Sequence, residues 1–181
     1  MEVVERPLPK PSSEGYVEAR LLEALVEARL ALRFLEEGLT RNAAGKAFQA
    51  WKAFMAALLR LELDKLKALA RSEEERRWLE SKAVPRMPTA EMKPLARFLE
   101  AMGHDGLALW AGSVLMLHDY QYHGPDPSGE LSKYATREDA VADILSAVQE
   151  LARRIETLRG RVKWSDELEK ALQQLRQALT H

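Results

Sequence analysis

The most apolar stretch of the chain runs from Thr40 to Leu61. Its hydrophobic residues recur every three or four positions, as on one face of a helix, and further large apolar residues extend that face around most of the circumference. Several alanines and Gly45 keep parts of this surface small, so neighbouring helices can approach closely. The pattern therefore predicts a long helix at the centre of a bundle, with Thr40 as its N-cap.

The same spacing on both sides of this stretch predicts the other helices. One helix begins near Tyr16 and ends at Gly38, and the short link that follows predicts an antiparallel hairpin with the central helix. The central pattern itself continues past Leu61 to a break near Arg71. Later helices are predicted from the N-cap candidates Ser72, Thr89, Asp105, Thr136 and Ser165, with ends at Pro85 and Pro88, Gly103, His123 and Gly160. Because Pro94 lies late for a first turn, it can shift the start of the helix after Thr89. The predicted fold class is all-α, an up-and-down antiparallel helical bundle of six to seven helices.

Composition divides the chain into three predicted parts. Residues 1–14 contain three prolines, which predict a flexible, proline-rich N-terminal arm. Residues 15–160 are predicted to form the helical bundle domain, and residues 161–181 a C-terminal accessory helix. The leucine seam of that last helix needs a partner surface, in this chain or in a second copy. The apolar seams of the first and last helices together predict a homodimer.

Charge and cysteine content exclude several classes of protein. The 181 residues carry 27 basic and 28 acidic side chains, a net charge of −1, so no overall field attracts nucleic acid or an anionic membrane. The absence of cysteine excludes disulfides and fits the cytoplasm. The start of the chain lacks the apolar core of a signal peptide, and no apolar run is long enough to span a membrane. The single asparagine and the abundance of Arg and Glu are typical of a thermophile.

Common catalytic motifs are missing from the sequence. It contains no glycine-rich phosphate loop after a strand, no pair of Glu-x-x-His segments and no Gly-x-Ser-x-Gly segment. Two imidazoles, His118 and His123, could ligate a metal ion, but their five-residue spacing places them about 140° apart on a regular helix. We therefore expect no metal site and no cofactor.

The first candidate site is the segment HDYQYHG, residues 118–124, where an apolar helix meets a long loop. Its candidate catalytic residues are His118, Asp119 and His123, because imidazoles titrate near neutral pH and can act as base and acid on RNA. In that reading His123 is the general base, His118 the acid or a phosphate contact, and Asp119 orients one imidazole. Tyr120 and Tyr122 are candidate ligand-binding residues. The alternative is structural, since His and Tyr also stabilise ordinary helix ends.

The second candidate site is polar and lies in the first half of the central helix. Arg41, Lys46 and Gln49, together with Asn42 and Lys52, interrupt an otherwise apolar pattern there. They predict a surface for an anionic ligand, with Arg41 near the positive end of the helix. The alternative is a strip that simply faces solvent. Any recognition surface is expected where this charged beginning meets the turn that carries the histidines.

Three segments together resemble one known family. They are RNAAGKAFQAWKAFMAAL from residue 41, HDYQYHG from residue 118 and TREDAVADILSAVQEL from residue 136. The chain resembles the HEPN superfamily over roughly residues 16–158, and within it the archaeal PaREP branch. This resemblance implies a four-helix HEPN-like core with additions and a tendency to dimerise.

The resemblance also bears on activity. Many HEPN proteins are metal-independent ribonucleases with an Arg, a polar residue and then a His at this point of the fold. Asp119, His123 and Gly124 match that pattern, but His118 replaces the Arg, and the other Arg-to-His pair, Arg97 and His104, is interrupted by a glycine. His is largely neutral at pH 7, whereas Arg would hold a phosphate with a fixed charge.

Three hypotheses for function follow from these observations. The first is a non-catalytic HEPN-like binding or interaction module, with a nucleotide, an RNA or a nucleotidyltransferase-type protein as partner. The second is a metal-independent, toxin-like endoribonuclease that uses His118, Asp119 and His123. The third is a structural scaffold protein.

Overall fold

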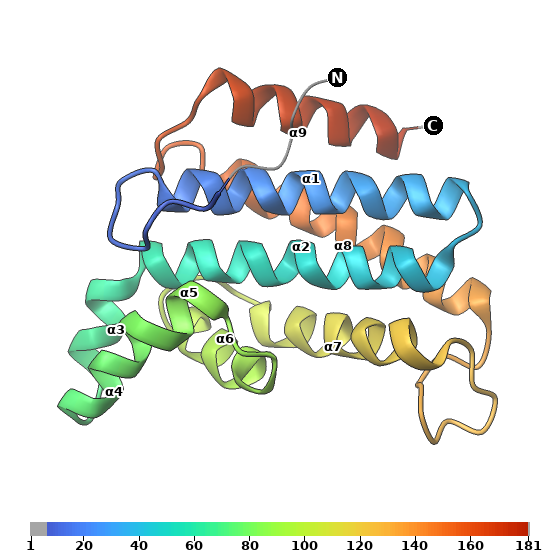
Figure 1. The fold of residues 1–181 in the computed structure, drawn as a ribbon, viewed down its shortest axis with the longest axis horizontal. Helices are drawn as coiled ribbons and strands as arrows, with labels where there is room; N and C mark the ends of the chain where they lie inside the picture. The colour runs from blue at the N-terminus through green and yellow to red at the C-terminus, as the bar shows by residue number, and fades with distance from the viewer. Residues whose placement is uncertain (1–6, 181) are drawn as a thin grey trace.

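The computed structural model describes residues 7–180, which are helical over most of their length (Figure 1). The long helices are α1 (Tyr16–Glu36), α2 (Thr40–Leu61), α7 (Leu107–His123), α8 (Arg137–Thr157) and α9 (Asp166–Leu179). The shorter elements are α3 (Leu63–Leu69), α4 (Glu73–Trp78), the π-helix η1 (Leu79–Ala83), α5 (Val84–Arg86), the 3₁₀-helix η2 (Thr89–Glu91) and α6 (Met92–Glu100). The predicted all-α helical bundle is confirmed.

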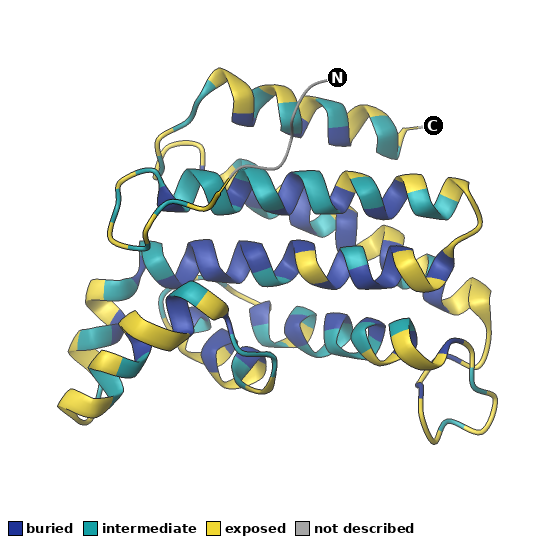
Figure 2. Ribbon diagram, viewed as in Figure 1, coloured by how far each residue is buried: buried dark blue, intermediate teal, exposed yellow. Residues whose placement is uncertain are grey.

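Helix α2 lies at the centre of the bundle, as predicted. It packs against α1, α7 and α8, with α1 and α7 on opposite sides of it and α8 behind (Figure 1). Fifteen of its 22 residues are buried, compared with seven of the 21 residues of α1. Figure 2 shows this difference as the nearly continuous dark blue of α2 toward its C-terminal end. The exposed positions of α2 concentrate in its first half, the half predicted to be polar.

Trp51 joins α2 to two of its neighbours. Its fully buried indole stacks on Trp110 of α7, with ring centroids 5.5 Å apart and an interplanar angle of 12°. Its Nε1 donates a hydrogen bond of 2.9 Å to the Ala147 carbonyl of α8. Phe54, one turn further along α2, meets the same ring edge-on. One side chain therefore fixes the spacing of three helices.

The leucine seam of α9 packs against other helices of the same chain. Leu168, Leu172 and Leu175 are buried where α9 packs on α1 and α8. The corresponding face of α1 is therefore covered as well (Figure 1). The seams of the first and last helices are thus not free to form a dimer interface, which removes the original reason for expecting one.

Three of the predicted N-caps are confirmed. The hydroxyls of Ser72, Thr136 and Ser165 each accept a hydrogen bond from the backbone N–H three residues later. Such bonds satisfy one of the N–H groups that lack a partner in the first turn of a helix. The cap residues here were predictable because the signal is local in sequence.

The other three predicted N-caps are wrong. Thr40 is already the first residue of α2, and its hydroxyl accepts a hydrogen bond of 2.6 Å from Arg137 on α8. Gly106, with φ of +72°, precedes α7 in the position predicted for Asp105. Thr89 begins a 3₁₀ turn without a side-chain cap, and α6 starts at Met92, which places Pro94 in a first turn that tolerates proline.

The helical path after Ser72 ends between Pro85 and Pro88, as predicted. Pro85 lies inside α5 and does not end it, and the chain leaves the helix at Met87, whose φ is +41°. The preceding π-helix η1 widens the backbone spacing just before the proline. A wider turn relieves the clash between a proline ring and the preceding carbonyls, so the helical path survives.

The predicted flexible arm falls partly outside the described residues, which begin at residue 7. Within the described part, the Pro11 carbonyl accepts a hydrogen bond of 2.6 Å from Arg60 Nε at the end of α2. A backbone bond from Ser13 to Lys10 closes a turn just before α1. Residues 10–13 are therefore held against the bundle.

Among the helices of residues 7–180, none combines the length and the hydrophobicity that a membrane span requires.

Glu62 is a buried carboxylate where α2 ends and α3 begins. Its side chain is 1% exposed and pairs with Lys65 at 2.8 Å, with His104 at 2.9 Å and with Arg161. His104 lies in the turn before α7, and Arg161 in the turn before α9. Three connections between helices therefore meet at one negative charge. Burial raises the pKa of Glu62, but hydrogen bonds from these three partners outweigh it and lower the pKa to about 2.

Candidate functional site

The charged beginning of α2 lies against the C-terminal half of α7, which carries the histidines (Figure 1). The two helices approach closely at Gly45, where a Cβ atom would lie 2.6 Å from Cδ of Gln121. The Gln121 amide can reach α2 because Gly45 has no side chain. The two candidate sites of the sequence form one continuous region.

Arg41 closes the end of α7. Its Nε donates a hydrogen bond of 2.9 Å to the Gln121 carbonyl, and its Nη2 donates one to the Tyr122 carbonyl. These are among the last carbonyls of a helix, which lack partners within the helix itself. Gly124 follows with φ of +69°, and a Cβ atom there would lie 3.5 Å from the Arg41 side chain. Arg41 therefore holds the histidine-bearing turn in place.

An aromatic cluster lies beside this turn and consists of Phe48, His118 and Tyr122. The Phe48 and His118 rings stack with centroids 4.1 Å apart, and Tyr122 meets His118 edge-on at 5.2 Å. Lys52 Nζ lies 6.0 Å from the Phe48 ring centroid. Tyr122 is 59% exposed, so the cluster reaches from the core to the surface.

Two polar atoms of α7 in this region have no hydrogen-bond partner among the described residues. They are Nδ1 of His118 and Oε1 of Gln121, and both are buried. A buried polar atom without a partner is costly, and such atoms are uncommon in folded proteins. They lie one helical turn apart on the helix that packs against the polar half of α2. These two atoms, beside the aromatic cluster, could therefore still form hydrogen bonds to a ligand.

The predicted ligand residues Tyr120, Lys46 and Gln49 are not part of the aromatic cluster. Tyr120 is 1% exposed and packs edge-on against Tyr134 of the long loop, and burial raises its pKa. It is a core residue and is not available to a ligand. Lys46 forms an ion pair of 2.8 Å with Glu27 of α1, which neutralises its charge. Gln49 is exposed on the same half of α2 as Lys46.

The predicted catalytic residues do not converge in this chain. His118 and His123 both lie within α7, which is α-helical to its last residue, so the two side chains project about 140° apart. His118 is stacked in the aromatic cluster, whereas Asp119 and His123 are exposed. Within residues 7–180 no three His, Asp or Glu side chains gather in a way that could hold a metal ion.

The long loop after α7 is folded around Asp126. Its carboxylate accepts hydrogen bonds from the Ser128 hydroxyl and from the backbone N–H groups of Ser128, Leu131 and Ser132. These bonds lower the pKa of Asp126 below its ordinary value. Tyr134 then returns the loop to α8, where its hydroxyl donates to Asp143 at 2.8 Å. The loop therefore supports α7 from outside.

Phe48 belongs to the aromatic cluster, although its hydrophobic pattern predicts only a core residue. Its hydrophobicity placed it in the core seam, and it is in fact 1% exposed. The available signal was spacing: Arg41, Gly45, Phe48 and Lys52 are four, three and four residues apart and so share one face of α2. That face is the one that meets α7.

Comparison with known proteins places this architecture in a family. The family model described as the archaeal PaREP1/PaREP8 family matches residues 19–145, which include α2, α7 and the aromatic cluster. No curated protein and no solved structure matches the chain. The matched region covers more than half of the sequence. The chain therefore belongs to the archaeal PaREP1/PaREP8 family.

Proposed function

We propose that the protein is a non-catalytic binding module of the HEPN type, which binds single-stranded RNA or its nucleotides at the aromatic cluster. The observation that carries this proposal is the exposed Tyr122 ring edge-on to the His118–Phe48 stack. Exposed aromatic rings beside basic side chains are how proteins bind single-stranded nucleic acid, because every base can stack. Lys52 supplies a positive charge at the same place.

The endoribonuclease alternative has less support. Acid–base cleavage of RNA requires a base and an acid on opposite sides of one phosphate, within hydrogen-bond reach of the reacting oxygens. On one intact helix, His118 and His123 project away from each other. Arg41, which could hold a phosphate, already donates two hydrogen bonds to helix carbonyls. Binding without cleavage is therefore the better account, and a scaffold role is what would remain if no RNA bound.

Replacing Tyr122 with alanine is expected to weaken binding of a fluorescein-labelled oligouridine about tenfold or more, since stacking contributes roughly 1–3 kcal/mol per base. Fluorescence anisotropy at low salt measures the dissociation constant. Phe98 of α6 is a matched control, because it is also an exposed aromatic residue, at 47%. Phe98→Ala should leave the affinity unchanged.

The same RNA should be recovered intact after incubation without metal. Cleavage that disappears in His123→Ala would favour the ribonuclease instead. Equal affinity of wild type and Tyr122→Ala would remove the aromatic cluster from the proposal.

We further propose that the protein is a cytoplasmic homodimer that pairs through the outward face of α7. This helix has no charged residue from Leu107 to Leu117, although helical segments this apolar are normally buried. It packs on α2, α6 and α8, and Leu109, on another face, is 74% exposed. A two-fold contact pairs a surface with itself, so an uncharged face suits a second copy because no like charges meet. A nucleotidyltransferase-type partner is the remaining alternative for this face.

Leu109→Glu is expected to convert the dimer to a monomer at micromolar concentration. Two leucines would be lost from the interface and two carboxylates would oppose each other, which should raise the dissociation constant roughly tenfold or more. Sedimentation velocity measures the mass. Leu69→Glu is the control, since Leu69 of α3 is also exposed, at 60%, and lies away from α7. A wild-type monomer would contradict the proposal.

A further inference from the structure

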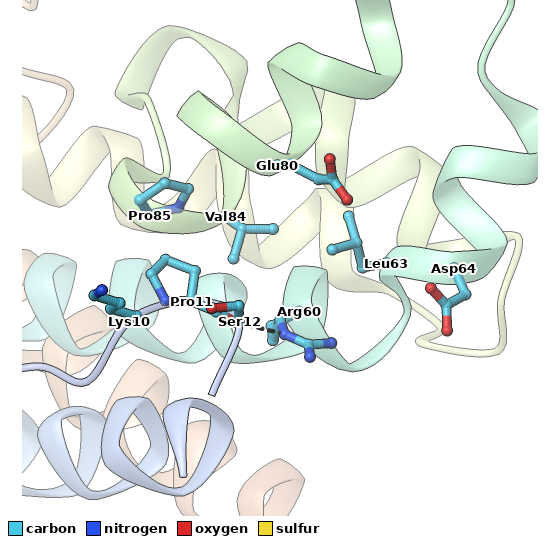
Figure 3. A pocket seen from close by; sticks show the side chains of 9 residues that line it. All are labelled: Lys10, Pro11, Ser12, Arg60, Leu63, Asp64, Glu80, Val84 and Pro85. Atoms are coloured by element: carbon cyan, nitrogen blue, oxygen red, sulfur yellow. Dashed lines mark hydrogen bonds between the residues drawn. The ribbon is translucent and has the colours of Figure 1, made fainter. Parts of the chain in front are cut away.

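A separate cavity of about 690 Å³ lies at the far end of α2 from the aromatic cluster. It opens between the N-terminal arm at residues 10–12, the α2–α3 junction, and the elements η1 and α5 (Figure 3). Its volume is within the range of small-molecule binding sites in proteins, about 300–1,000 Å³. Neither candidate site of the sequence includes it.

Hydrogen bonds fix the walls of this cavity. Arg60 Nε holds the Pro11 carbonyl at 2.6 Å, which fastens the arm along one side. On the other side, the buried Tyr16 hydroxyl donates to the Val84 carbonyl at 2.9 Å, and Arg20 donates to the Pro85 carbonyl at 2.6 Å. The π-helix η1 runs directly into this wall, and π-helical turns are frequent at functional sites. The cavity is therefore pre-formed.

Charges of both signs line the cavity, and several are unpaired. Within residues 7–180, the Lys10 ammonium and the Asp64 carboxylate form no hydrogen bond or ion pair, and the terminal nitrogens of Arg60 form none either. Glu80, in contrast, is paired with Lys67. Figure 3 shows Lys10 and Asp64 at opposite ends of the cavity, with Arg60 between them. One end of the cavity therefore carries the unpaired positive charge of Lys10 and the other end the unpaired negative charge of Asp64, with the Arg60 guanidinium between them.

The remaining lining is apolar. Val84 lies near the middle of the cavity and Leu63 toward the Asp64 end, whereas Pro11 and Pro85 lie toward the Lys10 end (Figure 3). Apolar walls with a few placed polar groups are the usual construction of a ligand site, in which the polar groups fix orientation. A ligand that fits has an apolar body and two charged ends.

We propose that this cavity binds a small zwitterion of the short-peptide type. Lys10 receives its carboxylate, Asp64 receives its ammonium group, and its side chains contact Leu63 and Val84. A simple organic anion would leave Asp64 facing a like charge, whereas a zwitterion pairs both ends. The volume suits a dipeptide or tripeptide better than one amino acid. This proposal does not depend on RNA binding at the aromatic cluster.

The dipeptide Leu-Leu and two derivatives test the proposal by isothermal titration calorimetry on the full chain at neutral pH. Leu-Leu should bind, while N-acetyl-Leu-Leu, without the ammonium group, and Leu-Leu amide, without the carboxylate, should each bind about tenfold more weakly. Asp64→Asn should remove the preference for the free ammonium group, and Lys10→Ala should reduce the preference for the free carboxylate. Both substitutions are at exposed or unpaired side chains and should leave the fold intact. Asp105→Asn, at an exposed carboxylate elsewhere, should bind like wild type.

Two results would overturn the proposal. One is the absence of binding heat for Leu-Leu and a panel of other apolar dipeptides and tripeptides at millimolar concentration. The other is tighter binding of N-acetyl-Leu-Leu than of Leu-Leu, which would identify a site for simple anions.

Discussion

Replacing Glu62 with alanine is expected to lower the free energy of unfolding by about 3 kcal/mol at neutral pH. The Glu62 carboxylate is 1% exposed and joins Lys65, His104 and Arg161, and its pKa is lowered to about 2. Removing one member of a buried charged group leaves the others unpaired, which typically costs 3–5 kcal/mol. The lower end applies because Lys65 and Arg161 are partly exposed and can be solvated. Urea denaturation followed by far-UV circular dichroism measures the change.

The same carboxylate predicts how stability depends on pH. Because the pKa of Glu62 is lower in the folded protein than its ordinary value of 4.5, its contribution is fully present above that value. It should be lost as the pH falls from about 4.5 toward 2, where the folded state must also take up the proton. The difference in stability between wild type and Glu62→Gln should therefore shrink over this range.

Glu36 is a suitable control for the substitution. It is an exposed glutamate at the end of α1. Glu36→Ala should change the free energy of unfolding by less than about 0.5 kcal/mol. A similar small change for Glu62→Ala would mean that the buried cluster does not stabilise the fold.

The contrast between α2 and Glu62 shows what the sequence could predict. The position of α2 at the centre of the bundle was predictable because its 22 consecutive residues show a dense apolar pattern. The role of Glu62 as a buried ion-pair centre was not predictable, because its partners His104 and Arg161 are 42 and 99 residues away in the chain. Nothing in the local pattern distinguishes this glutamate from those that face solvent.

In the candidate site, too, local patterns were predictable from the sequence and long-range contacts were not. The sequence led to the expectation that the charged start of α2 meets the turn that carries the histidines, and the hydrogen bonds of Arg41 to that turn confirm it. It could not predict that Tyr120 is buried, because the residue that covers it, Tyr134, comes from a loop without periodicity. The predicted end of this helix at His123 is confirmed, and the two imidazoles are separated as their five-residue spacing on a regular helix predicts. Side-chain positions at the end of a helix depend on where the helix stops, and here Arg41 and Gly124 determine that point.

Replacing Trp51 with alanine is expected to destabilise the protein by about 3–5 kcal/mol, the largest effect of any single substitution considered. The indole is fully buried, so its removal leaves a cavity that rigid neighbouring helices can fill only in part. The stack on Trp110 and the hydrogen bond to Ala147 are lost together, and with them direct contacts of α2 with α7 and α8. Guanidinium denaturation measures the loss.

Two further substitutions separate the causes. Trp51→Phe keeps most of the apolar volume but removes the Nε1 donor, and should cost about 1–2 kcal/mol. Trp78→Ala removes an indole that is only partly buried on α4, and should cost less than half as much as Trp51→Ala. Equal losses at Trp51 and Trp78 would show that α2 is not the element on which the packing of the bundle depends. A large loss at Trp51 alone would instead mean that the packing of α2 on α7 and α8 depends on this one buried ring.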